Sequence, residues 1–334
     1  MLGWKPKSFD PTVASVRYRC MIPLRELQSV NFPVELFDSQ KADSYQGVIF
    51  SKCYEPSDQD LARRLRSRGA SVVLDLCDNH FYNPFSLPAY VKARNNLLEM
   101  IGLADVIVCS TPTLADTVTA EAALGEPPEV VGDPVEFPDV QPCANRTGER
   151  SCHKLMWFGI HGSPNAPCGM RDILAIADVL RDVFQTAKGI VELVVCSNSR
   201  EEYDRSIAPL KIASSYVDYS VEEFPGLLSG MDGVILPVNR NPFTWAKSHN
   251  RLTTALFAGI PVVADAVPSY QEFAEFCSLE DWSSGLRELL FDPVKAQQKA
   301  LAGRDYIMQR WMPRNVAERW LQVLSRLPGV ASPL

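Results

Sequence analysis

Short runs of apolar residues alternate with longer stretches whose apolar residues recur at helical spacing along most of the chain. This alternation is typical of α/β proteins with parallel sheets, in which strands and helices follow one another. In the first half, the apolar runs predict strands at residues 47–50, 71–75, 105–109 and 129–131. The stretches between them predict helices at residues 57–68, 90–102 and 111–123. Ser57 is expected to cap the first of these helices, and Pro112 lies in the first turn of the last.

A second series of the same kind follows residues 133–150, which lack periodicity, are rich in Pro, Asn, Gly and charge, and predict a linker. Its apolar runs predict strands at residues 154–158, 190–195, 233–236 and 261–264. Helices are expected at about residues 170–186, 221–231 and 251–258. The sequence therefore predicts an α/β protein with two Rossmann-like domains facing a central cleft, a first domain at 1–146 and a second at 153–305. Ligands of such sheets bind at the carboxyl ends of the strands.

The composition is that of an ordinary globular protein long enough for two cores, with 334 residues, 46% of them hydrophobic and 22% charged. A net charge of −7 argues against direct nucleic-acid binding and against docking on anionic lipid through a basic patch. No apolar run approaches the roughly 20 residues of a transmembrane segment, and the N-terminus lacks the apolar core of a signal peptide. We therefore expect a cytoplasmic protein.

The chain has nine cysteines, an odd number, and they are widely spread without any C-x-x-C spacing. This usage favours free thiols in a reducing compartment and gives no sign of a zinc site. The second half also lacks an Asp-x-Asp motif. We therefore expect no metal and no cofactor.

The stretch from Lys247 to Tyr270 predicts a short helix, ended by Gly259, and then a buried strand. Ser248 or His249 is expected to cap the helix. Lys247, Ser248, His249, Asn250 and Arg251 at its start are candidate phosphate ligands, because free backbone N–H groups and the positive helix end also favour an anion. Lys247 and Arg251 share one helix face if the helix reaches back to Lys247. The alternative is an ordinary αβ unit with a solvated basic edge.

A second candidate phosphate segment follows the strand at 154–158, where glycines at a turn allow close approach of the backbone. Its candidate ligands are Gly159, His161, Gly162, Ser163 and Asn165. The spacing is not G-x-G-x-x-G, so a dinucleotide-binding fingerprint is not supported. His161 and His249 come from the two segments that would face the ligand, although single loop histidines are usually solvated.

Asp78 and His80 follow the buried strand that ends at Asp75, and are the candidate catalytic residues of the first domain. Either could remove a proton from an acceptor hydroxyl, with Asp78 favoured because it is nearer the strand end. The alternative is that Asp78 and Asn79 simply form an Asx turn. Arg17 and Arg19 alternate on what reads as extended chain, where both side chains point one way and could contact substrate or form a surface salt bridge.

The order of several segments resembles the nucleotide-sugar glycosyltransferases of GT-B fold, in particular the large retaining group with a Glu–seven residues–Glu motif. The segments are residues 15–27, 103–111, 157–163, 231–237, 247–270 and 306–320. The resemblance implies that the first domain binds an acceptor and the second a nucleotide-diphosphate sugar. It also implies that a C-terminal helix, within residues 306–334, crosses back to the first domain.

The chain departs from the pattern of that group at three positions. Thr254 and Ala246 stand where the two glutamates belong, and Cys168 replaces a basic residue before Gly169. Lys247 and Arg251 are then the expected phosphate cations. The resemblance implies metal-independent transfer of a sugar to an unidentified acceptor, which could be a glycan, a lipid-linked sugar or a small molecule. The alternatives are a nucleotide-sugar epimerase of the same fold and a degenerate, non-catalytic nucleotide-sugar binding protein.

Overall fold

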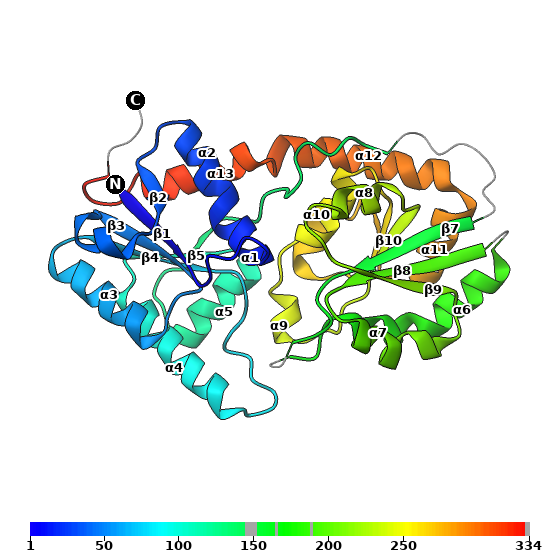
Figure 1. Cartoon of the computed structure of the whole chain (residues 1–334), viewed down its shortest axis with the longest axis horizontal. Coiled ribbons are helices and arrows are strands. Elements are labelled where there is room, and N and C mark those ends of the chain that lie inside the picture. The colour runs from blue at the N-terminus through cyan, green and yellow to red at the C-terminus, as the bar shows by residue number, and fades with distance from the viewer. Residues whose placement is uncertain (144–151, 164–165, 188–189, 331–334) are drawn as a thin grey trace. The chain divides into compact units, whose positions relative to one another are not determined.

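The computed structural model of the protein describes residues 1–143, 152–163, 166–187 and 190–330 (Figure 1). The chain divides into two compact units. The first consists of Met1–Glu136, the three residues Ala246–Ser248, and the chain from Arg310 onward. The second contains the described residues of Phe137–Trp245 and His249–Gln309. The three-residue part of the first unit lies within a stretch of sequence that otherwise belongs to the second.

The first unit is built on a six-stranded parallel sheet with the strand order β2-β1-β3-β4-β5-β6. Its strands are β1 (Leu2–Pro6), β2 (Val34–Leu36), β3 (Gly47–Ser51), β4 (Ser71–Leu76), β5 (Val106–Cys109) and β6 (Glu129–Val130). The last four confirm the strands that the apolar runs predict. The apolar pattern misses β1 and β2. The sequence of β1, LGWKP, contains Gly, Lys and Pro, residues that are depleted in strands.

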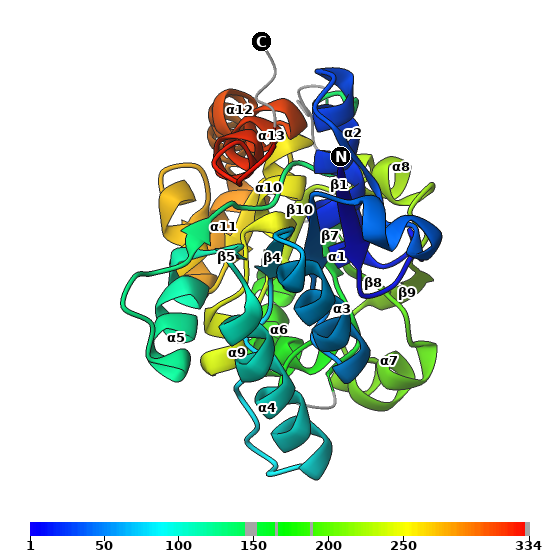
Figure 2. The ribbon, with the colours of Figure 1, turned by 90° about the vertical axis from the view of Figure 1, so that its left-hand side faces the viewer.

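Helices cover both faces of this sheet: α3, α4 and α5 lie on one face, and α2 and α13 on the other (Figures 1 and 2). Their bounds are α1 (Ala14–Val16), the π-helix η1 (Arg17–Met21), α2 (Ile22–Ser29), the 3-10 helix η2 (Ser39–Ser44), α3 (Pro56–Ser67), α4 (Pro88–Leu103), α5 (Pro112–Ala122) and α13 (Pro313–Leu324). Three predicted helices are thus confirmed to within a residue or two. Helix α3 is capped by Glu55, in a capping box with Asp58, and not by Ser57.

Side chains of β4 alternate between the two faces of the sheet, as the period of a strand requires. Val72, Leu74 and Leu76 belong to the apolar cluster under α3, α4 and α5. Asp75 points to the opposite face, where it is fully buried. On that face Trp4 packs edge-on against Trp320 of α13, with ring centroids 4.9 Å apart. The C-terminal chain is therefore part of the first unit's core.

The second unit repeats the plan, with a six-stranded parallel sheet in the order β12-β11-β10-β7-β8-β9. Its strands are β7 (Cys152–Phe158), β8 (Ile190–Ser197), β9 (Ser214–Asp218), β10 (Gly233–Leu236), β11 (Val262–Ala264) and β12 (Ser278–Leu279). The helical elements are η3 (Met170–Ile176), α6 (Ala177–Thr186), α7 (Arg200–Ser206), η4 (Ala208–Leu210), α8 (Phe224–Ser229), α9 (Pro242–Trp245), α10 (Asn250–Phe257), η5 (Pro268–Phe273), α11 (Trp282–Phe291) and α12 (Pro293–Arg310). The strands predicted in this half are confirmed; β9 and β12 were not predicted.

Three predicted helices differ from the observed ones. The helix expected at 221–231 is shorter, spanning only Phe224–Ser229. The helix expected at 170–186 begins as a 3-10 helix and becomes α-helical only at Ala177. The single C-terminal helix is instead two helices, because Pro313 cannot continue the hydrogen bonding of α12 and starts α13. The predicted linker also differs at its start, since residues 133–136 belong to the first unit, while residues 144–150 lie outside the described part of the chain.

The two parallel sheets with flanking helices confirm the predicted α/β class with two Rossmann-like folding units. All strands of each sheet are parallel, so their carboxyl ends lie at one edge. The strand order reverses beside β1 in the first sheet and beside β7 in the second, which is where such sheets usually bind ligands.

We predict that Trp320→Ala lowers the free energy of unfolding of the first unit by about 3–5 kcal/mol, the usual cost of emptying a buried tryptophan site. Trp320 is fully buried and also lies beneath the Arg19 guanidinium, 5.5 Å from its ring centroid. The measurement is a urea titration followed by circular dichroism. The matched control is Trp245→Ala, at a tryptophan that is 37% exposed in the second unit; an equal loss in both variants would contradict the role given to Trp320.

Candidate functional site

Charged side chains follow three adjacent strands of the first unit at the same edge of the sheet. Lys7 follows β1, Lys52 follows β3, and Asp78 comes two residues after β4. The strands are in register there, with Pro6 opposite Ser51 and Ser51 opposite Asp75. This edge is the carboxyl end of the sheet, where parallel α/β folds bind ligands.

Asp78 is an ion-pair acceptor for two lysines. Lys52 Nζ lies 2.5 Å from one carboxylate oxygen, and Lys247 Nζ donates to the other. Burial alone would raise the pKa of Asp78, but the two ammonium groups outweigh it and hold the pKa well below its ordinary value. A carboxylate with so low a pKa is a weak proton acceptor. The Asx turn of this loop is made by Asn79, whose side-chain oxygen accepts the Phe81 N–H at 3.1 Å.

His80 lies beside Asp78, its Nε2 being 3.9 Å from a carboxylate oxygen. Its Nδ1 is 2.7 Å from the Tyr54 hydroxyl, and the two groups share a hydrogen bond. Burial lowers the pKa of His80 to about 4, although Asp78 acts in the opposite direction. The imidazole is therefore neutral at neutral pH.

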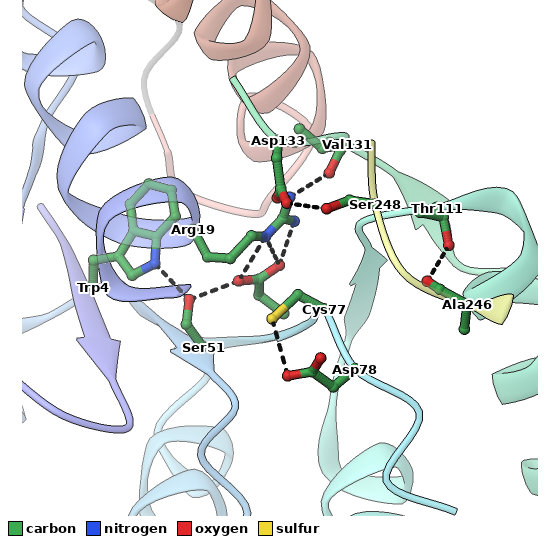
Figure 3. A network of polar contacts seen from close by, with 11 residues as sticks. Trp4, Arg19, Ser51, Cys77, Asp78, Thr111, Val131, Asp133, Ala246 and Ser248 are labelled. Carbon is green, nitrogen blue, oxygen red and sulfur yellow. Dashed lines mark hydrogen bonds and ion pairs between the residues drawn. The ribbon is translucent and has the colours of Figure 1, made fainter. Parts of the chain in front are cut away.

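Arg19 is the centre of a buried network that Cys77 separates from Asp78 (Figure 3). Its Nη2 donates to Asp75 at 2.6 Å, and its Nη1 donates to the Val131 carbonyl at 2.6 Å and to Asp133 at 3.0 Å. Asp75 also accepts from Ser51, whose hydroxyl in turn accepts the Trp4 indole N–H, each at 2.8 Å.

The expectation of extended chain at Arg17 and Arg19 is wrong, since both lie in the π-helix η1. Such helices are rare and often occur at functional sites. Both side chains are buried, and each pairs with an acid: Arg19 as described, and Arg17 with Glu136. Both guanidinium groups therefore form salt bridges, but these are buried and not at the surface as the sequence analysis suggested.

The segment Ala246–Ser248 is bound to the first unit by three polar contacts. Thr111 Oγ1 donates to the Ala246 carbonyl at 2.9 Å, Lys247 pairs with Asp78, and the Ser248 hydroxyl donates to Asp133. Helix α10 begins only at Asn250, so it does not reach back to Lys247 as expected. His249 occupies the N-cap position without a capping hydrogen bond from its side chain, and Ser248 is engaged elsewhere. Lys247 and Arg251 therefore do not share a helix face.

Arg251 lies against the candidate phosphate segment of the second unit, as the sequence suggested. Its Nη1 is 3.4 Å from the Phe158 carbonyl, and a Cβ added at Gly159 would lie 3.3 Å from the same nitrogen. The guanidinium also interacts electrostatically with Tyr270 and with the carboxylate of Asp172. The structure thus brings the end of β7 and the start of α10 together around one cation.

The loop after β7 closes on Gly169, which has a positive φ of 106°. A Cβ at this position would lie 2.6 Å from the His161 carbonyl, so only glycine fits. The Met170 N–H donates to that carbonyl at 3.0 Å, and Asp172 accepts the Gly169 N–H at 3.0 Å. The backbone of Gly162 is also close, since the same added Cβ would lie 2.8 Å from the Gly162 Cα.

The remaining predicted ligands have different environments. His161 is exposed, and its backbone N–H donates to the Asn198 side chain at 2.9 Å. His249 is buried with its ring edge-on to Phe273, the centroids being 5.3 Å apart, so it is not a second loop histidine at the surface. Ser163 and Asn250 are partly buried, and Asn165 lies outside the described residues.

Within the described part of the chain, no group of three or more His, Cys, Asp or Glu side chains could hold a metal ion. All nine cysteines are described, and none forms a disulfide. None of the helices in the described ranges is both long and apolar enough to cross a membrane.

The sequence analysis missed Lys7, Lys52 and Asp133. Lys52 follows its strand much as Asp78 follows the next one, and this correspondence could have identified it. Lys7 could not be found in this way, because β1 was not predicted. Asp133 was assigned to a linker, whereas its side chain is buried between Arg19 and Ser248.

No family model and no curated protein matches this chain. Solved structures do match. The chain is similar to Anabaena HepE, solved in complex with UDP and glucose, with a TM-score of 0.69, 15% identity, and coverage of 98% of this chain and 99% of HepE. The lipopolysaccharide outer core galactosyltransferase WaaB matches with a TM-score of 0.62, 12% identity, and coverage of 98% and 99%. S. aureus TarM gives a TM-score of 0.62 and 12% identity over 83% of this chain, which spans about half of TarM's length, 54%.

These similarities span nearly the whole chain for HepE and WaaB, and they show that the protein has the fold of the GT-B glycosyltransferases. The family resemblance drawn from the order of the sequence segments is confirmed at the level of the fold. At 12–15% identity, the reaction and its substrates have to be argued from the residues of this chain.

We predict that the first unit loses stability as the pH falls from about 6.5 to 4, and that His80→Asn flattens this loss. The folded-state pKa of His80, about 4, lies below its ordinary value of 6.5. The unfolded chain therefore binds the proton more tightly. The stabilisation is complete above pH 6.5 and is lost as the pH falls toward 4, by up to about 3 kcal/mol.

The measurement is the free energy of unfolding from urea titrations across this pH range. Asparagine keeps both a donor and an acceptor beside the Tyr54 hydroxyl but does not titrate. His153→Asn, at a histidine of β7 in the second unit, should leave the first unit's pH dependence as it is. If His80→Asn keeps the full wild-type slope, another group causes the acid sensitivity.

Proposed function

We propose that this protein transfers a sugar from a nucleotide-diphosphate sugar to an acceptor. The observation that carries the proposal is the position of Arg251, whose guanidinium contacts the backbone at Phe158–Gly159, at the carboxyl end of β7. A guanidinium and a glycine turn at this edge suit a diphosphate. The UDP bound to HepE, a protein of the same fold, supports a nucleotide ligand of this kind.

The donor would bind to the second unit through the loop after β7 and the start of α10. In this proposal Gly159 and Gly162 allow the loop backbone to approach the phosphates, and Arg251 supplies the charge. Ser163 and Asn165 donate hydrogen bonds, and His161 offers a further polar contact. Asp172 helps to fix the loop, because it accepts the Gly169 N–H at 3.0 Å. Catalysis would be mainly electrostatic, with these fixed groups stabilising the negative charge of the departing diphosphate.

Lys247 and Ser248 have a different place in the proposal from the one their sequence suggested. Their side chains are engaged by Asp78 and Asp133 in the first unit. We therefore assign them to holding the segment that precedes α10, and leave Arg251 as the main phosphate cation of the donor site.

The acceptor would bind to the first unit, near Asp78 and His80. Because its pKa is held well below the ordinary range, Asp78 stays ionised and orients Lys52 and Lys247. We propose a positioning role for Asp78. His80 is neutral at neutral pH and is the better proton acceptor of the two, although a pKa of about 4 makes it a weak one.

A second candidate function, a nucleotide-sugar binding protein without catalysis, is favoured by the environments of Ala246 and Thr254. Ala246 is buried in the apolar cluster of the first unit, and the Thr254 hydroxyl donates to the Asn250 carbonyl at 2.7 Å. Neither position offers a carboxylate. Incubation with UDP-glucose separates the three functions: a transferase releases UDP and glucose slowly in water, an epimerase yields the isomeric nucleotide sugar, and a pure binder yields neither.

We predict that Arg251→Ala weakens UDP binding by about 1.5–3 kcal/mol, the range for hydrogen bonds to charged groups. Isothermal titration calorimetry with UDP measures the change. Arg287→Ala is the matched control, because Arg287 lies in the same unit and pairs with Asp182 at the surface. Equal UDP affinity in wild type and Arg251→Ala, with both folded, would place the phosphates elsewhere.

We predict that turnover of the nucleotide sugar does not depend on a divalent metal ion, because Arg251 and the N-terminal end of α10 can neutralise the diphosphate. The measurement is product formation after treatment with a chelator, compared with untreated protein. Complete loss of activity that Mg²⁺ or Mn²⁺ restores would contradict the electrostatic scheme.

A further inference from the structure

Among the described residues, the carboxyl edge of the first unit's sheet has more lysines than carboxylates that form ion pairs with them. Asp78 is shared, since Lys52 and Lys247 each contact one of its oxygens. Lys7 is exposed at the end of β1, and within the described ranges no carboxylate forms an ion pair with it. Its Nζ lies 5.9 Å from the centroid of the Tyr54 ring, and the Tyr54 hydroxyl is hydrogen-bonded to His80.

The neighbouring Lys5 shows what a matched lysine looks like at this edge. Its Nζ lies 2.6 Å from Asp58, so the pair is neutral. Lys7 and Lys52 differ from it. Lys7 has no ion-pair partner in the part of the chain that the structure describes, and Lys52 shares Asp78 with a second cation. The positive charge stands out in a protein whose net charge is −7.

Two features of Lys52 are energetically unfavourable, its partly buried charge and its backbone conformation. Its side chain is only 18% exposed, and keeping an ammonium partly out of water is unfavourable unless negative charge matches it. Its φ of 59° is a left-handed conformation that is uncommon for lysine and is typical of functional positions. The Lys52 N–H donates to the Asp75 carbonyl at 2.9 Å, which fixes this backbone. A bound anion would supply the missing negative charge.

We propose that Lys7 and Lys52 bind an anionic group, a phosphate, sulfate or carboxylate, carried by the acceptor of the sugar. The inference rests on the proposed function, and it names the acceptor class: a sugar or sugar-containing chain with a negative charge. Buried Tyr54 lies between Lys7 and His80, since its ring centroid is 5.9 Å from Lys7 Nζ and its hydroxyl is 2.7 Å from Nδ1 of the neutral His80. The anion site lies wholly in the first unit and is distinct from the donor site at Arg251.

The experiment is isothermal titration calorimetry at low ionic strength with inorganic phosphate, glucose 6-phosphate, glucuronic acid and glucose. At least one of the two charged sugars should bind ten times more tightly than glucose, and its affinity should fall as salt is added. Glucose 6-phosphate and glucuronic acid distinguish a phosphate-bearing from a carboxylate-bearing acceptor. Binding of all three sugars with equal affinity, or of none, would overturn the inference.

Two variants locate the site. Lys52→Met and Lys7→Met keep an apolar stem of similar length and should each weaken anion binding about ten- to a hundredfold, as expected for a lost charged hydrogen bond. Lys7 is exposed, so its variant remains informative if Lys52→Met fails to fold. Lys41→Met is the matched control, because it removes the same charge from a surface pair with Glu35 in the same unit. Equal weakening in Lys7→Met and Lys41→Met would reduce the effect to net charge and overturn the inference.

UDP titrations of the same samples separate this inference from the proposed function. If UDP binds in a manner sensitive to Arg251→Ala but anionic sugars do not bind, the acceptor inference fails alone. If anionic sugars bind through Lys7 and Lys52 but no nucleotide binds, the transferase proposal fails and the anion site remains.

Discussion

The buried contact of Arg19 with Asp75 and Asp133 is the interaction on which the first unit depends. Arg19 is 1% exposed, and Asp75 is fully buried. Burial by itself would lower the pKa of Arg19, and the two carboxylates raise it instead, so the guanidinium stays charged. Removing one partner of such a pair leaves a buried charge uncompensated, which costs about 3–5 kcal/mol. The network joins η1, β4 and the chain after β6, segments far apart in sequence, and so fixes the edge from which Cys77 and Asp78 extend (Figure 3).

The same network reaches the segment Ala246–Ser248 through Asp133. One oxygen of Asp133 accepts from Arg19 and the other from Ser248, so one side chain connects the core of the first unit to a segment that leads into α10. Thr111 holds the same segment while it caps α5, since its hydroxyl accepts from the Leu114 N–H and donates to the Ala246 carbonyl. Asp133, which the sequence assigned to a linker, and Thr111, a helix cap, thus both hold the segment that places Lys247 beside Asp78.

The sequence predicted the parts that local periodicity determines. Eight strands, β3 to β8, β10 and β11, were predicted, and most of them are buried, nearly continuous apolar runs. The prediction failed at β1, because its Lys, Gly and Pro residues are not typical of a strand. It also failed at η1, where Arg17 and Arg19 were expected in extended chain but lie in a π-helix that buries both. The sequence pointed to candidate residues where charge follows an apolar run, at Asp78 and His80, and around Arg251. Residues were missed where the partner is distant, because no local pattern shows that Asp133 meets Ser248, 115 residues away.

The acid–base character of the site follows from which carboxylates have cations beside them. Asp75 and Asp78 are three residues apart on one strand end, and burial raises the pKa of both. Arg19 does not fully offset that effect for Asp75, whose pKa stays above the ordinary value, whereas Lys247 and Lys52 reverse it for Asp78. Asp78 therefore keeps its charge and uses it to hold two ammonium groups. Because those groups share one carboxylate, the edge keeps positive charge beside a neutral His80, an arrangement better suited to holding an anion than to removing a proton with an aspartate.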